Sequence, residues 1–254
     1  TNLLEDKTVA AVVVNFRDIT EHRYIDQERN DFVSIVSHQL RNPLASIKWV
    51  IELLLDNNVT EAQRTKLNNV YKENERLINI VNDLLILNRL EIGRIPSKKA
   101  VVDVEEMIKS LIKIHELQAK HKSMKIAFST DERAKSVFVD LSQISEALKN
   151  ILDNAISYGA AGSKIGIEVS KSGERCVISV YNEGGAISIE DQPRIFGKFY
   201  RGRRASQMKP SGSGLGLYIA KLNVERNGGS IWFESPTKDD QGVTFYISLP
   251  VGPI

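Results

Sequence analysis

The sequence predicts a long antiparallel helical hairpin followed by a separate α+β sandwich. Two observations lead to this fold class. From about Glu21 to Glu91, apolar residues recur every three or four positions with one short interruption, which is the spacing of amphipathic helices. After Pro96 the pattern changes to short alternating strands and helices, which is typical of a mixed sheet-and-helix domain. The length of 254 residues suits one or two domains of ordinary size.

The first residues are expected to form a strand. Thr8–Phe16 is rich in β-branched side chains, and Asp18-Ile19-Thr20 follows almost at once. Because the sequence begins with Thr1 and not with methionine, we expect it to be a fragment of a longer protein.

The first long helix is expected to begin at about Glu21. Its apolar stripe continues past Pro43. A proline inside a helix removes one backbone hydrogen bond and crowds the preceding turn. We therefore expect a bend close to His38.

The second long helix has a clear start and a clear end. Thr60-Glu61-Ala62-Gln63 has the pattern of a capping box, while Gly93 and Pro96 end the helical spacing. Two long helices joined by a short turn cannot cover their whole apolar stripe. A dimeric four-helix bundle is the natural completion of such a hairpin.

The remainder of the chain alternates between helices and strands. Helices are expected at Val104–His121, Leu141–Tyr158 and Gly214–Asn227. Strands are expected at Lys125–Ser129, Ser136–Val139, Lys164–Ser170, Glu174–Tyr181, Ser230–Ser235 and Gly242–Leu249. Cys176 lies in an alternating apolar stretch and is expected to be a small core residue. His115 and His121 lie in a polar helical stretch and are expected to be exposed, and not metal ligands.

The composition is that of a folded, soluble protein. It includes 34 basic and 32 acidic side chains, a net charge of +2 and 42% hydrophobic residues, which excludes a disordered tail and a supercharged polyanion binder. The basic residues are scattered, so nucleic-acid binding has no support. The longest apolar runs, such as Val9–Val14, are far shorter than the roughly 20 residues that cross a bilayer. We expect a cytoplasmic chain that meets a membrane only through segments outside it.

Two helical motifs carry side chains suited to phosphate chemistry. Ser37–Leu44 places His38 at the edge of the apolar stripe, where a neutral imidazole can act as a nucleophile. In Asn150–Tyr158, the amides of Asn150 and Asn154 are four residues apart and share one helix face. Such a pair can offer carbonyl oxygens to a hard cation or amide donors to phosphates.

Two glycine-containing motifs follow in the second half of the chain. Asn182–Ile187 comes directly after a strand, and Gly212–Leu217 opens a helix. Glycines before a helix N-terminus allow backbone N–H groups to approach phosphates closely, and the helix dipole also favours anions there. Each loop alone is a weak signal, but the four motifs occur together and in a fixed order.

In this order the motifs resemble those of the sensor histidine kinases of two-component signalling. Their characteristic boxes are matched by Ser37–Leu44 (H box), Asn150–Tyr158 (N box), Asn182–Ile187 (G1), Arg194–Arg201 (F) and Gly212–Leu217 (G2). The segment Asp18-Ile19-Thr20 is similar to the end of a PAS sensor domain. The resemblance implies three parts, namely the end of a PAS-like domain (1–20), a signalling helix with a dimerising phosphotransfer hairpin (21–96), and a catalytic ATP-binding domain of the GHKL type (97–254).

The resemblance also implies roles for single residues. His38 would be the phosphoacceptor, whose Nε2 attacks the γ-phosphorus of ATP before the phosphoryl group passes to an aspartate of a response-regulator receiver domain. Gln39 can accept a hydrogen bond from the imidazole Nδ1–H. Asn42, one turn further on, suggests phosphatase activity toward the regulator, because an amide can orient a hydrolytic water. Asn154, supported by Asn150, is expected to hold Mg²⁺ and phosphate oxygens.

The remaining implied roles concern the nucleotide. Tyr158 is expected to line the adenine pocket, Asn182 to face the adenine amino group, and Ile187 and Leu215 to form its walls, with residues 201–211 as a lid. The full set assigned to ATP is Asn150, Asn154, Tyr158, Asn182, Gly184, Ile187, Lys198, Phe199, Tyr200, Arg201, Gly212, Gly214, Leu215, Gly216 and Leu217.

Three positions depart from the family pattern. Gln39 replaces the usual acid, Asn182 replaces the usual aspartate, and Ala186 replaces the third glycine of its box. They motivate an alternative, a degenerate pseudokinase or phosphatase that binds partners without efficient autophosphorylation. An ATPase of the wider fold, which activates water with a glutamate, is disfavoured because the matching residue here is Asn150, whose amide cannot serve as a base.

Overall fold

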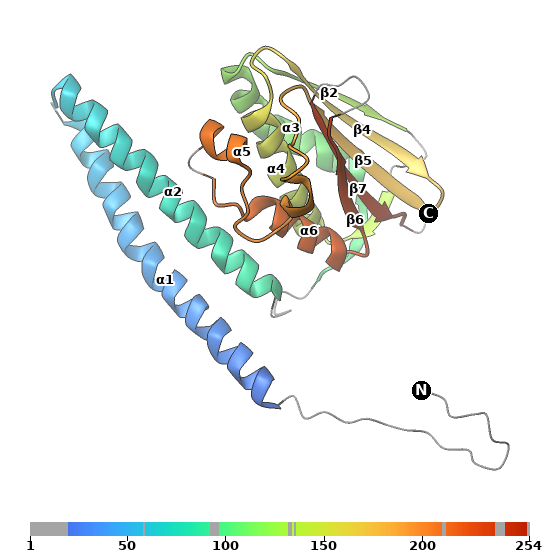
Figure 1. Cartoon of the computed structure of the whole chain (residues 1–254), viewed down its shortest axis with the longest axis horizontal. Coiled ribbons are helices and arrows are strands. Elements are labelled where there is room, and N and C mark those ends of the chain that lie inside the picture. The colour runs from blue at the N-terminus through green and yellow to red at the C-terminus, as the bar shows by residue number, and fades with distance from the viewer. Residues whose placement is uncertain are drawn as a thin grey trace.

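A computed structural model describes residues 20–57, 59–91, 97–131, 134, 136–209, 212–236 and 242–252. Two long helices lie beside a sandwich of helices and sheet (Figure 1), as the sequence predicts. The strand expected at Thr8–Phe16, and with it the end of a PAS-like domain, lies outside the described residues. No helix in the described ranges is both long and apolar enough to cross a bilayer.

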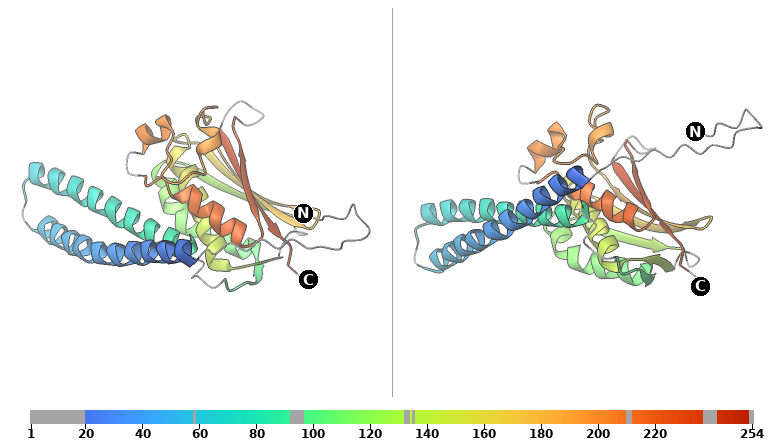
Figure 2. Two further views of the ribbon diagram at one scale, coloured as in Figure 1. Left: turned by 60° about the horizontal axis from the view of Figure 1, so that its bottom comes forward. Right: turned by 90° about the horizontal axis from the view of Figure 1, so that it is seen from below.

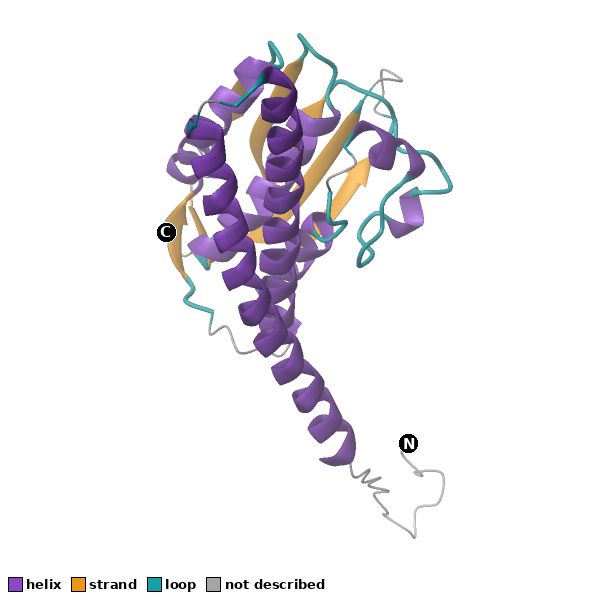
Figure 3. Ribbon diagram, turned by 90° about the vertical axis from the view of Figure 1, so that its left-hand side faces the viewer, coloured by secondary structure: helices purple, strands orange, loops and turns teal. Residues whose placement is uncertain are grey.

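The hairpin consists of α1 (Thr20–Asp56) and α2 (Glu61–Glu91). Helix α1 continues through Pro43. The capping box before α2 forms as predicted, because the Thr60 N–H donates to Gln63 Oε1 at 2.9 Å and the Gln63 N–H donates to Thr60 Oγ1 at 3.3 Å. The two helices lie side by side (Figure 3), and Arg41 donates to Asn82 Oδ1 across them at 2.8 Å.

Part of the apolar stripe of the hairpin stays uncovered in the single chain. Several large side chains on both helices are more than 40% exposed, namely Leu40, Ile47, Val50, Leu54, Val70 and Leu77. Among the residues of the two helices whose burial is described, the buried hydrophobic ones are Ile51, Val81, Leu85, Leu87 and Leu90. A patch of this kind on a hairpin is an unusual surface for a monomer.

The sandwich has one five-stranded sheet with its helices on one face (Figure 2). The strand order is β2 (Lys125–Thr130), β4 (Lys164–Ser172), β5 (Arg175–Asn182), β7 (Val243–Pro250), β6 (Ser230–Glu234). Only the β2–β4 pair is parallel. The covering helices are α3 (Val104–His121), α4 (Leu141–Tyr158) and α6 (Gly216–Arg226). The core lies between these helices and the sheet.

The sequence missed three short elements. Strand β1 (Ala100–Asp103) pairs antiparallel with β3 (Ser136–Val139) in a separate two-stranded sheet. A 3₁₀ turn occupies Gln192–Arg194, and helix α5 (Arg203–Met208) lies in the segment expected as a lid. These three short elements contain no alternating or helical spacing of apolar residues that would distinguish them from a loop.

Two isolated side chains test the sequence reading of the core. Cys176 is fully buried, as predicted. His115 is buried as well, with 2% of its surface exposed, so the expectation that it is exposed was wrong. Its position on α3 explains the error, because Ile108, Leu111 and Ala119 lie on the same buried stripe.

Burial makes a prediction for Cys176. Because the apolar surroundings disfavour the thiolate, burial raises the pKa of this thiol to about 11. In the folded protein at pH 8 the thiol should not react with an aromatic disulfide reagent. It should react fully in 6 M guanidinium, and rapid stoichiometric labelling without denaturant would contradict this packing.

Candidate functional site

A cavity of about 1590 Å³ lies between α2 and the part of the sandwich formed by α4, α5 and the loop before α6. Four of the sequence motifs meet in it, although they are far apart in the chain. The residues singled out from the sequence that line it are Asn150, Asn154, Tyr158, Asn182, Ile187, Tyr200, Arg201, Gly212, Gly214, Gly216 and Leu217. Its volume exceeds that of an ordinary small-molecule pocket, because α2 adds a further wall.

Helix α4 supplies the polar wall of the cavity. Asp140 caps its N-terminus by accepting from the backbone N–H of Ser142 and of Gln143. The amide of Asn150 donates to the Glu146 carbonyl at 3.0 Å, which fixes its orientation. Asn154, one turn further on, also lines the cavity. Two amide groups are thus held on one face of a rigid helix, as the spacing predicts.

The glycine loop before α6 lies against α4. Gly214 has φ +73°, and a Cβ there would come within 2.7 Å of the Phe199 carbonyl carbon. A Cβ on Gly216 would lie 3.0 Å from Asn150 Oδ1. A side chain at Gly214 would therefore collide with the backbone of Phe199, and a side chain at Gly216 would push the loop away from α4. Glycine is needed here for close packing and for an unusual backbone conformation.

The loop after β5 closes the inner end of the cavity. Asn182 is 4% exposed, and Gly184 forms a β-bridge with Gly159 at the end of α4. Ala186 does not have a positive φ. Among the described residues, the non-glycine residues with a positive φ are Ser123 and Phe199. An alanine is compatible with such a backbone, so this departure from the family pattern does not obstruct the loop.

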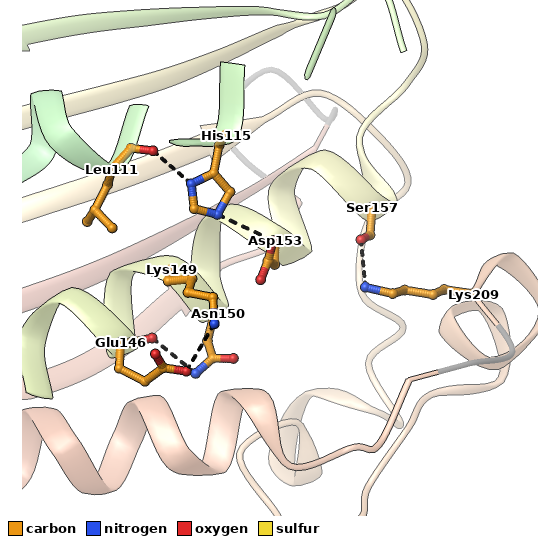
Figure 4. A network of polar contacts seen from close by, with 8 residues as sticks. All are labelled: Leu111, His115, Glu146, Lys149, Asn150, Asp153, Ser157 and Lys209. Atoms are coloured by element: carbon orange, nitrogen blue, oxygen red, sulfur yellow. Dashed lines mark hydrogen bonds and ion pairs between the residues drawn. The ribbon is translucent and has the colours of Figure 1, made fainter. Parts of the chain in front are cut away.

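Basic side chains from residues 201–209, the segment that contains α5, line the same cavity. The Arg201 guanidinium donates to the backbone carbonyls of Ala205 and Lys209 and so holds α5 in place. The Lys209 ammonium donates to Ser157 Oγ at 3.0 Å (Figure 4). Sequence analysis placed a lid here but did not single out Lys209.

Four of the residues assigned to ATP lie away from the cavity lining. Gly184 has a structural role in the β-bridge. The Lys198 ammonium is 5.3 Å from the centre of the Tyr218 ring, and Phe199 is 59% exposed. Leu215, expected as a wall of the base pocket, is instead fully buried in a cluster that faces α2.

That cluster joins the sandwich to the hairpin. Leu215 and Ile219 pack with Leu87 and Leu90 of α2, and the Arg226 guanidinium donates to the Leu90 carbonyl at 2.9 Å. Apolar contact between two separate parts of a chain buries surface on both.

A polar contact accompanies the cluster. Ser213 Oγ donates to Asp83 Oδ2 at 2.6 Å and accepts from the Leu215 N–H at 3.2 Å. Burial raises the pKa of Asp83, although the hydrogen bond from Ser213 opposes this. The α2 residues that line the cavity are Tyr71, Lys72, Glu73, Glu75, Arg76, Asn79, Ile80 and Asp83. No local pattern of the sequence could have identified them.

The remaining motif lies on α1. The backbone of His38 is helical, and its side chain lies outside the described part of the structure. Gln39 and Asn42 are exposed, and the Asn42 carbonyl accepts from Ser46 Oγ at 3.1 Å. No described residue of α1 lines the cavity. The structure therefore brings together the motifs of the sandwich but not the histidine motif.

Two family models match consecutive parts of the chain. Residues 28–93 match the "His Kinase A (phospho-acceptor) domain", and residues 139–253 match the "Histidine kinase-, DNA gyrase B-, and HSP90-like ATPase". The chain belongs to the sensor histidine kinase family. The first range covers most of the hairpin, and the second covers the sandwich from the end of β3 onward, including the motifs of the cavity.

Known sensor kinases resemble the chain over nearly its whole length. "Sensor protein kinase WalK" of Staphylococcus aureus is 32% identical over 248 residues, which is 95% of this chain and 58% of that protein. The structure titled "Crystal structure of ShkA full-length in complex with AMPPNP" has a TM-score of 0.73 at 24% identity and covers 88% of this chain and 46% of that one. The catalytic domain of histidine kinase ThkA is 28% identical, with a TM-score of 0.54, over 61% of this chain and 96% of that one.

The contact between α2 and α6 makes a prediction. Leu87→Ala removes a buried side chain from the cluster, which should weaken the contact by about 2 kcal/mol. Hydrogen exchange measured by mass spectrometry should then show faster exchange of the α6 amides, with little change in the five-stranded sheet. Leu117→Ala, on the exposed side of α3, is the matched control. Unchanged exchange in α6 would contradict the contact.

Proposed function

We propose that this chain is the core of a kinase that uses ATP to phosphorylate itself on His38 and then passes the phosphoryl group to an aspartate of a response regulator. The observation that supports this most is the meeting of Asn154, Asn182 and the glycine loop in one cavity, within a chain that also carries a histidine motif on a separate helix. The proposed parts are a PAS-like end (1–20), the phosphotransfer hairpin (21–96) and the catalytic domain (97–254).

The residues of the cavity suit ATP with Mg²⁺. The buried Asn182 offers an amide oxygen to the adenine amino group, and Ile187 and Leu217 offer apolar walls. The backbone of the glycine loop can approach phosphates closely. Asn154, with Asn150 beside it, would hold Mg²⁺, since amide oxygens suit this hard cation. When bound, the ion would neutralise part of the phosphate charge.

The proposed chemistry needs little from the protein beyond positioning. His38 Nε2 would form a bond to the γ-phosphorus while the bond from that phosphorus to the bridging oxygen breaks, and ADP leaves. Gln39 can hold the Nδ1–H as an acceptor and so leave Nε2 free to attack. In the next step the phosphoryl group would pass to a carboxylate oxygen of the regulator, which regenerates the imidazole.

In the arrangement described, α2 and not α1 faces the cavity. Nucleotide in the cavity would therefore reach His38 only after the contact of Leu215 and Ile219 with α2 has opened, or by acting on a second copy of the hairpin. Both routes use the catalytic domain as a mobile carrier of ATP.

The exposed apolar stripe supports a homodimer. Residues such as Leu40, Ile47 and Leu54 would lie in the seam of a four-helix bundle. A receiver domain with a phosphorylatable aspartate is the second proposed partner. We propose a cytoplasmic location for this chain, with any membrane attachment made through other segments.

The first test is transfer of label from γ-labelled ATP with Mg²⁺. The wild-type chain should acquire a label that is lost in acid and retained in base, because phosphohistidine has this stability. His38→Ala should acquire none. The control is nucleotide binding by the variant, which should be unchanged because no sandwich residue is altered.

The possible outcomes separate the activity from the alternative. Labelling of His38→Ala to the wild-type level would refute His38 as phosphoacceptor. Absence of label in a wild-type chain that binds ATP would refute autophosphorylation and leave the pseudokinase or phosphatase.

A further prediction concerns Asn42. If its amide orients a hydrolytic water, Asn42→Ala should slow dephosphorylation of the phosphorylated regulator by about 10-fold or more and leave labelling of His38 within about twofold. Ser46→Ala, one turn further along the exposed face, is the matched control. An equal loss of both activities in Asn42→Ala would contradict this role.

A further inference from the structure

A buried histidine lies directly behind the polar wall of the cavity. His115 of α3 is 2% exposed. Its Nδ1 lies 2.8 Å from the Leu111 carbonyl oxygen, and its Nε2 lies 3.3 Å from Asp153 Oδ1 of α4 (Figure 4). The ring therefore connects α3 to α4, the helix that forms the polar wall of the cavity.

Both ring nitrogens face acceptors, and this has a consequence for the pair. A backbone carbonyl can only accept, so Nδ1 carries a proton. The contact with the Asp153 carboxylate then requires a second proton, either on Nε2 or on the carboxyl group. With that proton the pair has no net charge. The hydrogen bond with Asp153 raises the pKa of His115, although burial acts to lower it. The charged groups that act on the ring are Asp153 and Lys149, both from α4.

Asp153 itself faces the space in which we place the phosphates. Its side chain is 34% exposed and lines the cavity immediately before Asn154. Without a partner, its carboxylate would be free to turn into the cavity. A negative charge there would repel the phosphates of a nucleotide but would act little on the neutral adenosine part.

We propose that His115 is a positioning residue of the nucleotide site, which holds the Asp153 carboxylate against α3 and keeps its negative charge from opposing bound phosphates. This inference rests on the proposed function, because it takes the cavity to bind ATP. It assigns a role to a residue that lines no part of the cavity itself.

The test compares two ligands on the whole chain at pH 7. Dissociation constants for Mg²⁺–ATP and for adenosine are measured in the wild type and in His115→Leu. Loss of the histidine should weaken the binding of Mg²⁺–ATP by about tenfold, which is the effect expected of one uncompensated charge near the phosphates in a partly solvated site. Adenosine affinity should change by less than about twofold, since adenosine carries no charge.

Two further variants separate positioning from simple packing. His115→Gln keeps an N–H that can donate to Asp153, and it should retain most of the affinity for Mg²⁺–ATP. In an Asp153→Asn background there is no carboxylate charge to hold. There, His115→Leu should no longer weaken the binding of Mg²⁺–ATP more than the binding of adenosine. Should His115→Leu fail to fold alone, the same comparison is made with His115→Gln and His115→Asn, of which only the glutamine can reach Asp153.

The outcomes distinguish this inference from the proposed function. Equal weakening of both ligands, or a phosphate-specific loss that persists in the Asp153→Asn background, would overturn the role of His115 and leave ATP binding intact. A wild-type chain that binds neither ligand at millimolar concentration would overturn the proposed function and, with it, this role.

Discussion

The close pairing of α4 with α6 is the constraint on which the cavity depends, because these helices carry its polar wall and its glycine loop. One end is tied by the fully buried Asn227, which accepts from the Asp140 N–H at 2.7 Å and donates to Gln143 Oε1 at 2.9 Å. At the other end Gly216 lies against Asn150. Buried hydrogen bonds of this kind are costly to break singly, so the two helices form one rigid unit.

The opposite wall of the cavity is held differently. Helix α2 meets the sandwich through a small apolar cluster around Leu215 and through hydrogen bonds such as those from Ser213 to Asp83 and from Arg226 to the Leu90 carbonyl. The main core of the sandwich includes none of the α2 residues, so the hairpin and the sandwich can separate while each keeps its own buried core. One wall of the cavity is thus fixed by the fold, and the other depends on how the two parts dock.

This difference also explains what could be predicted from sequence. The hairpin, the individual strands of the five-stranded sheet and the capping box at Thr60 follow from local spacing, and the structure confirms them. The α2 wall and the burial of Leu215 arise from docking between distant segments, which no local pattern encodes. His115 is intermediate, because its spacing from Leu111 placed it on the buried stripe of α3, but its polar neighbours concealed this.

The charges around the cavity show why such pairing matters for phosphates. Acidic and basic side chains are equally numerous among the residues that line it, so the site has no excess of positive charge to attract a polyanion. Several of these acids are instead partnered locally: Asp153 by His115, Asp191 by the Tyr200 hydroxyl at 2.5 Å, and Glu146 by Lys149 at 3.4 Å. With these acids engaged, the phosphates of a nucleotide in the cavity would meet mainly the backbone N–H groups of the glycine loop and the cations of the α5 segment. Breaking one acid's partnership would alter this balance more than its distance from the phosphates suggests, since the freed carboxylate can turn toward them.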